Sequence, residues 1–191
     1  MNLILASQSP RRRELLGLMG LDFTVRVADI DETMDPGLPA AREVARVSRL
    51  KAQAVPREED DVVIAADTIV VCEGKILGKP RDEADAFRIL SLLSGRSHEV
   101  MTGMTVLRGG EAVTHTEVTK IHFRQLHPEE IRAYIATGEP MDKAGAYGIQ
   151  GGAALFADGM EGDYYNVMGL PVCRLGMILR SFGLPVWGVR V

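Results

Sequence analysis

The chain has 191 residues, 46% of them apolar and 25% charged, and a formal net charge of −4 at pH 7. This length fits one domain over residues 1–191 with a proper core and no interdomain linker, and the composition is ordinary for a globular protein. The mildly acidic balance argues against stable nucleic-acid binding and anionic membrane surfaces, and no apolar run approaches the roughly 20 residues that span a bilayer.

Strand and helix patterns alternate through the first half of the chain. Ser9 and Pro10 follow an apolar run at 2–6, and they predict the N-cap and first residue of a helix. Residues 62–66 are continuously apolar, as in a strand buried on both faces, and we expect that strand to end at Asp67. In order, we expect strands at 2–6, 23–27 and 62–66, with helices beginning at 10 and spanning 39–54.

The second half begins with a hairpin that turns at Gly74. We expect hairpins at 69–77 and 98–123, helices at 82–94, 127–138 and 170–182, and a short strand at 153–156. A glycine-rich loop fills 138–152, and we expect Asn166 to cap the last helix. Interleaved strands and helices indicate an α/β fold, with a mixed twisted sheet flanked by helices.

Three consecutive arginines, Arg11 to Arg13, occupy the first turn of the first predicted helix. Free backbone N–H groups already place about half a positive charge there, so further cations are unfavourable unless an anion binds. Guanidinium groups suit phosphate oxygens, and the alternative is a solvated basic face. Because successive helix residues lie about 100° apart, we expect two of the three to face one ligand, and Arg13 to be ordinary surface.

Asp67 is the second candidate, because a carboxylate next to a buried apolar strand needs a hydrogen bond, a cation or a metal. Ligands of open α/β sheets also gather at the carboxyl ends of strands. The alternative is an aspartate that caps a turn with Thr68. Two cations at 79–81 form a third candidate, for which a plain surface turn is the alternative. The segment 137–152 is a fourth, because it is long for a loop without secondary structure.

The spacing of the cysteines and histidines does not indicate a metal centre. Cys72 and Cys173 lack metal-like spacing, and we expect both to be buried free thiols in a reducing cytoplasm. The four histidines lack zinc spacing. The short apolar run near the N-terminus does not have the order of a signal peptide, so a soluble cytoplasmic protein is expected. Cations, a buried carboxylate and acidic residues together suit a polyphosphate with a divalent metal.

Five motifs resemble those of the Maf family of nucleoside triphosphate pyrophosphatases, and the likeness runs from Leu3 to about Leu179. They are Ala6-Ser7-Gln8-Ser9-Pro10-Arg11-Arg12, Ala66-Asp67-Thr68, Gly78-Lys79-Pro80, Asp142-Lys143-Ala144-Gly145-Ala146-Tyr147-Gly148-Ile149-Gln150-Gly151, and the segment from Asn166 to Pro171. Each motif is weak alone, whereas all five in this order are specific. Asp31-Glu32 and Lys51-Ala52-Gln53 match the family as well.

The resemblance implies an enzyme that hydrolyses a nucleoside triphosphate to the monophosphate and pyrophosphate, in a house-cleaning role in nucleotide pools. It implies a divalent metal, Mg²⁺ first and Mn²⁺ or Co²⁺ as alternatives, and a chain that forms homodimers. The implied fold has two lobes around a central cleft, similar to that of the inosine-triphosphate pyrophosphatases. Arg11, Thr68 and Gln150 match the branch that hydrolyses dTTP and UTP.

By the same resemblance, Asp67 is the expected catalytic base and, together with Glu32, the expected metal ligand. Arg12, Lys51 and Lys79 are the expected phosphate contacts, because phosphoryl chemistry depends on positioning and charge neutralisation. The full set of expected substrate contacts is Ser7, Arg11, Arg12, Lys51, Thr68, Lys79 and Gln150.

Two other activities stay open at this point. One is a pyrophosphatase directed at 7-methyl-GTP or other modified purine nucleotides. The other is a nucleotide-binding regulator of septum formation and cell division, which would release no pyrophosphate. Nucleic-acid binding through the arginine run is disfavoured by the net charge and by the lack of interleaved aromatic residues.

Overall fold

The computed structural model describes residues 2–35 and 37–189. Its contacts group the chain into two compact units. Unit 1 comprises Met1–Asp67, Thr102–Glu117 and Gly169–Val191, and unit 2 comprises Thr68–Met101 and Val118–Met168. Three long strands contribute residues to both units.

The strands form a mixed sheet in the order β2-β1-β3-β5-β6-β7, and β4 pairs with β3. β1 is parallel to β2 and β3, whereas β4 is antiparallel to β3 and β7 is antiparallel to β6. The expectation of an α/β fold with a mixed sheet is confirmed. The strands are β1 (Leu3–Leu5), β2 (Thr24–Val25), β3 (Val62–Cys72), β4 (Lys75–Leu77), β5 (Ser97–Arg108), β6 (Glu111–Phe123) and β7 (Ala157–Glu161).

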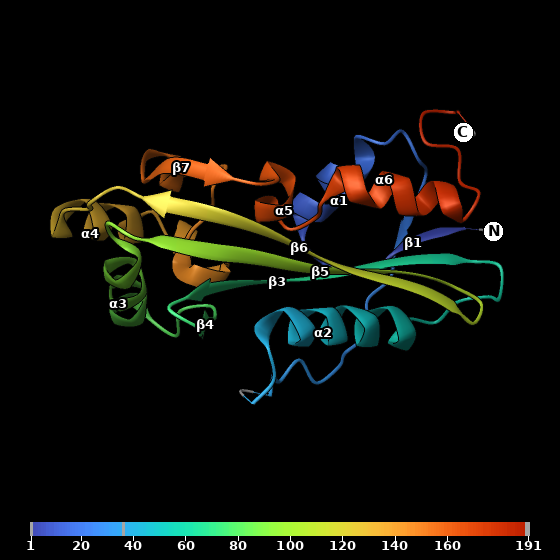
Figure 1. The fold of residues 1–191 in the computed structure, drawn as a ribbon, viewed down its shortest axis with the longest axis horizontal. Coiled ribbons are helices and arrows are strands. Elements are labelled where there is room, and N and C mark those ends of the chain that lie inside the picture. The colour runs from blue at the N-terminus through green and yellow to red at the C-terminus, as the bar shows by residue number, and fades with distance from the viewer. Residues whose placement is uncertain (1, 36, 190–191) are drawn as a thin grey trace. The chain divides into compact units, whose positions relative to one another are not determined.

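Unit 1 is layered, with helices on both faces of its strands (Figure 1). Its helices are α1 (Pro10–Gly17), α2 (Ala40–Ala54) and α6 (Val172–Ser181). α2 covers one face, and α1 and α6 cover the other (Figure 1). Side-chain hydrogen bonds connect α2 to the sheet. The hydroxyls of Ser48 and Thr105 share one at 2.9 Å, and the Thr116 hydroxyl donates to the carbonyl of Ala41 at 3.0 Å.

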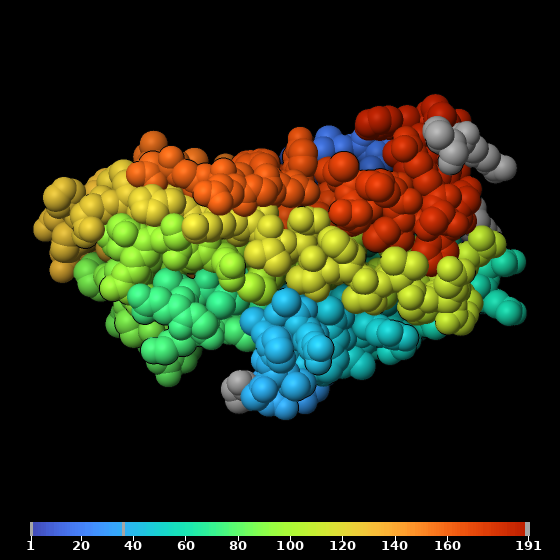
Figure 2. Space-filling model, viewed as in Figure 1, coloured from blue at the N-terminus to red at the C-terminus, as the bar shows by residue number. Residues whose placement is uncertain are grey.

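Local sequence signals set the start of α1. The Ser9 hydroxyl accepts a hydrogen bond from the backbone N–H of Arg12, and Pro10 is the first helical residue, as predicted. One apolar core then holds the helices of unit 1 on its strands, and it is centred on Ile4, Ala6, Ala52, Val55, Val63, Ala65 and Leu107. In the space-filling view, the first part of β6 reaches the surface between α6 in red and α2 in blue (Figure 2).

Unit 2 contains the helices α3 (Glu83–Leu93), α4 (Pro128–Ala136) and α5 (Tyr164–Met168), with the 3₁₀ turns η1 (Glu139–Asp142), η2 (Ala144–Ala146) and η3 (Gly152–Leu155). Edge-to-face ring contacts organise its core, since such pairs are favoured by the quadrupoles of aromatic rings. The rings belong to His98, Phe123, Tyr134, Tyr147 and Phe156. α3 and α4 pack against each other.

Three local expectations are wrong. The predicted strand at 153–156 is the 3₁₀ turn η3, and the strand β7 begins at Ala157 instead. Asn166 does not cap the last helix, because it lies inside α5, where its amide donates to the carbonyl of Val100 and the hydroxyl of Thr119. Cys173 is exposed rather than buried, because α6 turns Leu175, Ile178 and Leu179 to the core instead.

Asp67 is also placed differently from the prediction, since β3 does not end there. Thr68, Ile69 and Val70 continue the strand, and β-branched residues favour that extended conformation. Val70 pairs with Leu77 of β4, so the predicted hairpin at 69–77 is present, and its first strand is the second half of β3. The alternative of a turn capped by Asp67 is therefore excluded.

The prediction of a single domain with two lobes around a cleft stays a prediction. In the described part of the chain, no helix has both the length and the apolar character required to cross a bilayer.

Candidate active site

Asp67 and Lys51 form an ion pair inside unit 1. The Lys51 ammonium lies 2.8 Å from the Asp67 carboxylate, and the two side chains are only 15% and 13% exposed. Lys51 lies in the last turn of α2, whose buried face holds Val44, Val47 and Ala52 against the core. The half-buried carboxylate in β3 therefore has a nearby cation, which offsets the cost of removing it from water.

Glu32 completes a cluster of three charges. Its carboxylate lies 2.9 Å from the same Lys51 ammonium and is 57% exposed. One cation thus bridges two carboxylates that come from distant parts of the chain, the loop before α2 and the middle of β3. The three side chains together carry one net negative charge.

Arg12, in α1, is close enough to this cluster to be influenced by its charges. Its Nε donates to the backbone carbonyl of Gly169 at 2.7 Å, and its Nη1 donates to the Ser7 hydroxyl at 3.3 Å. Burial lowers the pKa of the guanidinium, whereas the charges of Asp67 and Glu32 act in the opposite direction. Arg12 is thus electrostatically coupled to both carboxylates and has a fixed orientation.

The remaining arginines of the first turn differ in exposure. Arg11 is half-buried, whereas Arg13 is exposed, as expected for the surface member of the three. Ser7 is buried, and its hydroxyl also accepts from the backbone N–H of Ser9 at 3.2 Å. With no acidic residue in the first turn of α1, this end of the helix is positively charged.

Thr68, Lys79 and Gln150 belong to unit 2. Lys79 and Gln150 are exposed, and Thr68 is half-buried next to Asp67 in β3. The backbone N–H of Gly145 donates to the carbonyl of Gly78 at 3.1 Å, which joins the segment around Lys79 to the loop that leads to Gln150. Gly145 has a φ of +70°, and a Cβ there would lie 2.7 Å from Val70, so only glycine fits this junction.

The same loop is anchored by an internal polar contact. The Tyr147 hydroxyl lies 2.8 Å from Nε2 of His98, and both side chains are buried. Burial lowers the pKa of His98 to about 4, so the imidazole is neutral at pH 7. A neutral ring can take part in this hydrogen bond without the cost of a buried charge.

Glu32 and Asp67 fit a magnesium-type ion. Mg²⁺ is commonly held by one or two carboxylates together with substrate phosphates and water. The described residues contain no group of three or more His, Cys, Asp or Glu side chains arranged for a metal, so an all-protein cage is absent from that part of the chain. Two carboxylates supply hard oxygen ligands, and an ion held by so few protein ligands needs further oxygen ligands from outside the protein.

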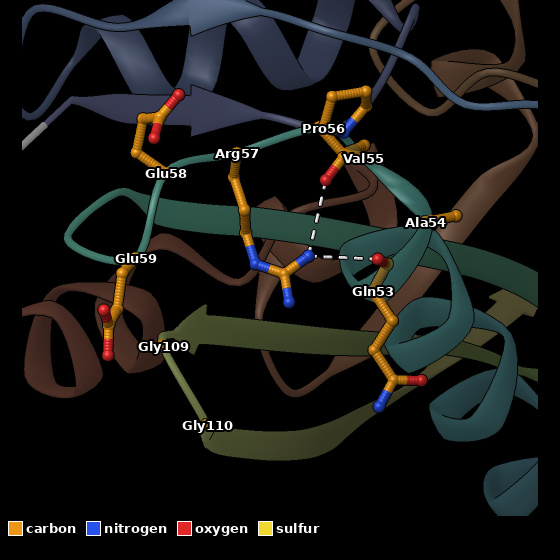
Figure 3. Close-up of a pocket in the computed structure, with 9 residues that line it drawn as sticks. All are labelled: Gln53, Ala54, Val55, Pro56, Arg57, Glu58, Glu59, Gly109 and Gly110. Atoms are coloured by element: carbon orange, nitrogen blue, oxygen red, sulfur yellow. Dashed lines mark hydrogen bonds between the residues drawn. The ribbon is translucent and has the colours of Figure 1, made fainter.

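A pocket of about 500 Å³ lies elsewhere in unit 1, beyond the end of α2 (Figure 3). Its lining residues are Gln53, Ala54, Val55, Pro56, Arg57, Glu58, Glu59, Gly109 and Gly110. Arg57 donates to the carbonyls of Gln53 and Val55 at 3.0 and 3.3 Å, and thereby satisfies free carbonyls at the helix end. None of the predicted site residues lines this pocket.

Gly169 is the contact that sequence reasoning missed. In the sequence it is only one residue of the segment from Asn166 to Pro171, whereas in the structure its carbonyl accepts a hydrogen bond from the Arg12 guanidinium. A glycine just before Leu-Pro is a signal for unusual backbone geometry, and its φ of +112° agrees with that. The partner of the carbonyl lies 157 residues away, which no local pattern indicates.

Comparisons with known proteins cover nearly the whole chain. A family model described as "Maf-like protein" matches residues 2–182. A dTTP/UTP pyrophosphatase of Moorella thermoacetica is 53% identical over 190 residues, which is 97% of each chain. Another, of Syntrophomonas wolfei, is 50% identical over 180 residues, 92% of this chain and 95% of the relative.

Among solved structures, a HAM1 protein from Coxiella burnetii matches 95% of this chain and 99% of its own, with a TM-score of 0.51 and 16% identity. At that identity the match shows the fold alone. The expected likeness to the inosine-triphosphate pyrophosphatase type of fold is confirmed at this level.

Proposed function

The chain belongs to the Maf-like protein family, and on that premise we propose that it hydrolyses dTTP and UTP to the nucleoside monophosphate and pyrophosphate. The observation that carries the proposal is the cluster of Lys51, Asp67 and Glu32, to which Arg12 is coupled. Relatives of about half-identical sequence over nearly their full length, named dTTP/UTP pyrophosphatases, support the choice of substrate.

Asp67 is proposed as the base that positions and deprotonates the water attacking the α-phosphorus. Its half-buried place in β3 and its contact with Lys51 fix the carboxylate, and a fixed geometry is what makes such a base effective. The proton leaves the water for a carboxylate oxygen, and the bond between the α-phosphorus and the bridging oxygen breaks to release pyrophosphate.

Glu32 and Asp67 are proposed to hold the divalent metal, Mg²⁺ first and Mn²⁺ or Co²⁺ as alternatives. When bound, such an ion neutralises charge that develops on the phosphate oxygens. Lys51 would then exchange some of its contact with these carboxylates for contact with the triphosphate. Lys51 is 15% exposed and has a long flexible stem, which suits this exchange.

We propose that the other phosphate contacts are Ser7, Arg12 and Lys79. The residues proposed to select the nucleotide base are Arg11, Thr68 and Gln150. Arg12 is held by two hydrogen bonds to the protein, so its guanidinium is oriented before substrate arrives. Gln150 offers both a donor and an acceptor, which the edge of a pyrimidine can pair with. We propose in addition a cytoplasmic homodimer, by analogy with the family.

The deciding experiment is a pyrophosphate-release assay with Mg²⁺ across a panel of ordinary and modified nucleoside triphosphates. We expect kcat/KM for dTTP and UTP to exceed that for 7-methyl-GTP and the purine nucleotides. Higher values for 7-methyl-GTP would assign the chain to the purine-directed activity instead. Binding of nucleotides without release of pyrophosphate from any of them would favour the regulatory role.

A further inference from the structure

A buried carboxylate that the proposed reaction does not use lies at the start of α2. Glu43 is only 1% exposed, although glutamate is seldom buried without a strong partner. Its carboxylate accepts hydrogen bonds from Nε of Arg46 at 2.9 Å and from Nη2 of Arg46 at 2.8 Å. This bidentate geometry is the strongest form of the pair, and it fixes both side chains.

The pair is attached to the loop that carries Glu32. The same carboxylate of Glu43 accepts from the backbone N–H of Asp35 at 2.7 Å. Nη2 of Arg46 donates to the backbone carbonyl of Thr33 at 2.8 Å. The loop is therefore held by its main chain at positions one and three residues beyond Glu32.

One helix thus fixes both sides of the contact between Glu32 and Lys51. Glu43 and Arg46 hold the loop from the first half of α2, and Lys51 extends from its last turn. In Figure 1 the chain that leads into α2 runs back alongside the helix, as this arrangement requires. Glu32 itself is more than half exposed, so burial does not hold it in place.

We propose that Glu43 and Arg46 are positioning residues that hold Glu32 where it binds the divalent metal together with Asp67. This inference rests on the proposed function, because it assumes that Glu32 is a metal ligand. A loop held in advance loses less freedom when the ion binds, so the ion binds more tightly. The partners that orient metal ligands typically contribute tenfold or more to metal affinity.

The first test asks whether the loop is held. Arg46 is 40% exposed, so Arg46→Ala removes the bidentate pair without opening the core. We expect hydrogen–deuterium exchange at residues 31–35 to become faster in this variant, with unchanged exchange in β3. The control is Arg49→Ala, which removes an exposed arginine from the same helix and should leave the exchange of the loop as it is. Unchanged exchange in Arg46→Ala would overturn the proposal.

The second test measures metal affinity directly. Mn²⁺ binding is followed by electron paramagnetic resonance, in the presence of a non-hydrolysable dTTP analogue. We expect Arg46→Ala to weaken Mn²⁺ binding about tenfold, and to leave kcat at saturating metal within about twofold. In a Glu32→Gln background, the same substitution should have no further effect on Mn²⁺ binding, because the ligand that it positions is already lost.

An equal loss of affinity in the Glu32→Gln background would show that Arg46 acts by another route, and would overturn the proposal. Arg46→Lys provides a second variant, which keeps the charge and loses the fork, and should give an intermediate affinity. Failure of the proposed function would look different. The wild-type protein would then release no pyrophosphate, while the exchange of residues 31–35 would still respond to Arg46→Ala.

Discussion

The ammonium group of Lys51 lies 2.8 Å from the carboxylate of Asp67, and both side chains are largely shielded from water. A pair of this kind is sensitive to the loss of either member, because the remaining charge is left without its counterion. The contact also joins a helix to a strand, so the position of Asp67 depends on the packing of α2. The predictions on catalysis follow from this contact.

Asp67→Asn should reduce kcat by at least about 100-fold, since general bases contribute 10²–10⁴-fold and an amide cannot accept the proton. Asparagine has nearly the same shape and Lys51 keeps Glu32 as a counterion, so β3 should be undisturbed and a non-hydrolysable dTTP analogue should still bind. Steady-state pyrophosphate release and calorimetric binding check the two parts. A kcat within tenfold of wild type would remove Asp67 from the role of base.

Lys51→Met should reduce kcat/KM for dTTP by about 100-fold or more, because it removes the cation that is proposed to stabilise the charge developing on the triphosphate. Methionine keeps the apolar stem of the side chain but leaves the half-buried carboxylate of Asp67 without this partner. We therefore expect a loss of stability as well, of about 3 kcal/mol in urea unfolding, as for other broken buried pairs. Lys51→Arg is the matched control and should keep most of the stability.

The parts of the fold that sequence reasoning predicted well depend on local chemistry. Ser9 and Pro10 define the start of α1 through a hydrogen bond and a φ angle that involve only neighbouring residues. The turn of the β3–β4 hairpin follows from Glu73 and Gly74, both of which adopt positive φ. These signals lie within a few residues of their effect.

The errors occur where a distant partner decides the outcome. Asp67 looked like the end of a strand because an aspartate in mid-strand is unfavourable, and Lys51, sixteen residues earlier in the chain, removes that cost. Asn166 has the residue type of a helix cap, but its side-chain amide donates hydrogen bonds to the carbonyl of Val100 and the hydroxyl of Thr119 instead. The hydrogen bond from the backbone N–H of Asp35 to Glu43 is likewise not predicted by any hydrophobic pattern in the sequence. The arginine run and Asp67 were predicted from local chemistry, whereas Glu32, Lys51 and the individual roles came from the resemblance, and those roles stay predictions.

Gly169→Ala should weaken nucleotide binding through Arg12. Gly169 has a φ of +112°, which an alanine tolerates poorly, so the carbonyl that holds the guanidinium should move. We expect KM for dTTP to rise by about tenfold, with a smaller change in kcat, because the proposed contact of Arg12 with phosphate would be made in both the ground state and the transition state.

The matched control for this substitution is Gly176→Ala in α6. No atom lies within 4 Å of a Cβ built at Gly176, and alanine favours helices, so this variant should be slightly more stable and fully active. An unchanged KM in Gly169→Ala would show that the carbonyl of Gly169 does not orient Arg12 for substrate.

His98 should make the stability of the protein depend on pH between about 6.5 and 4. Burial lowers its pKa to about 4, with a smaller contribution from the charge of His122, and in the described part of the chain its Nδ1 has no hydrogen-bond partner. His98 therefore becomes protonated near pH 6.5 in the unfolded chain but only near pH 4 in the folded chain. The contribution of His98 to stability is complete above pH 6.5, and it is lost as the pH is lowered toward 4.

The size of this loss is about 3 kcal/mol at pH 4, from about 1.4 kcal/mol per pH unit. His98→Gln can still bond to the Tyr147 hydroxyl but does not titrate, so its free energy of unfolding should change much less over this range. Urea unfolding at pH 7, 6, 5 and 4.5 measures the difference, and His115→Gln, at a partly exposed position on β6, should retain the wild-type dependence. If His98→Gln kept the full slope, the neutral imidazole would not be the group that links protonation to the anchoring of Tyr147.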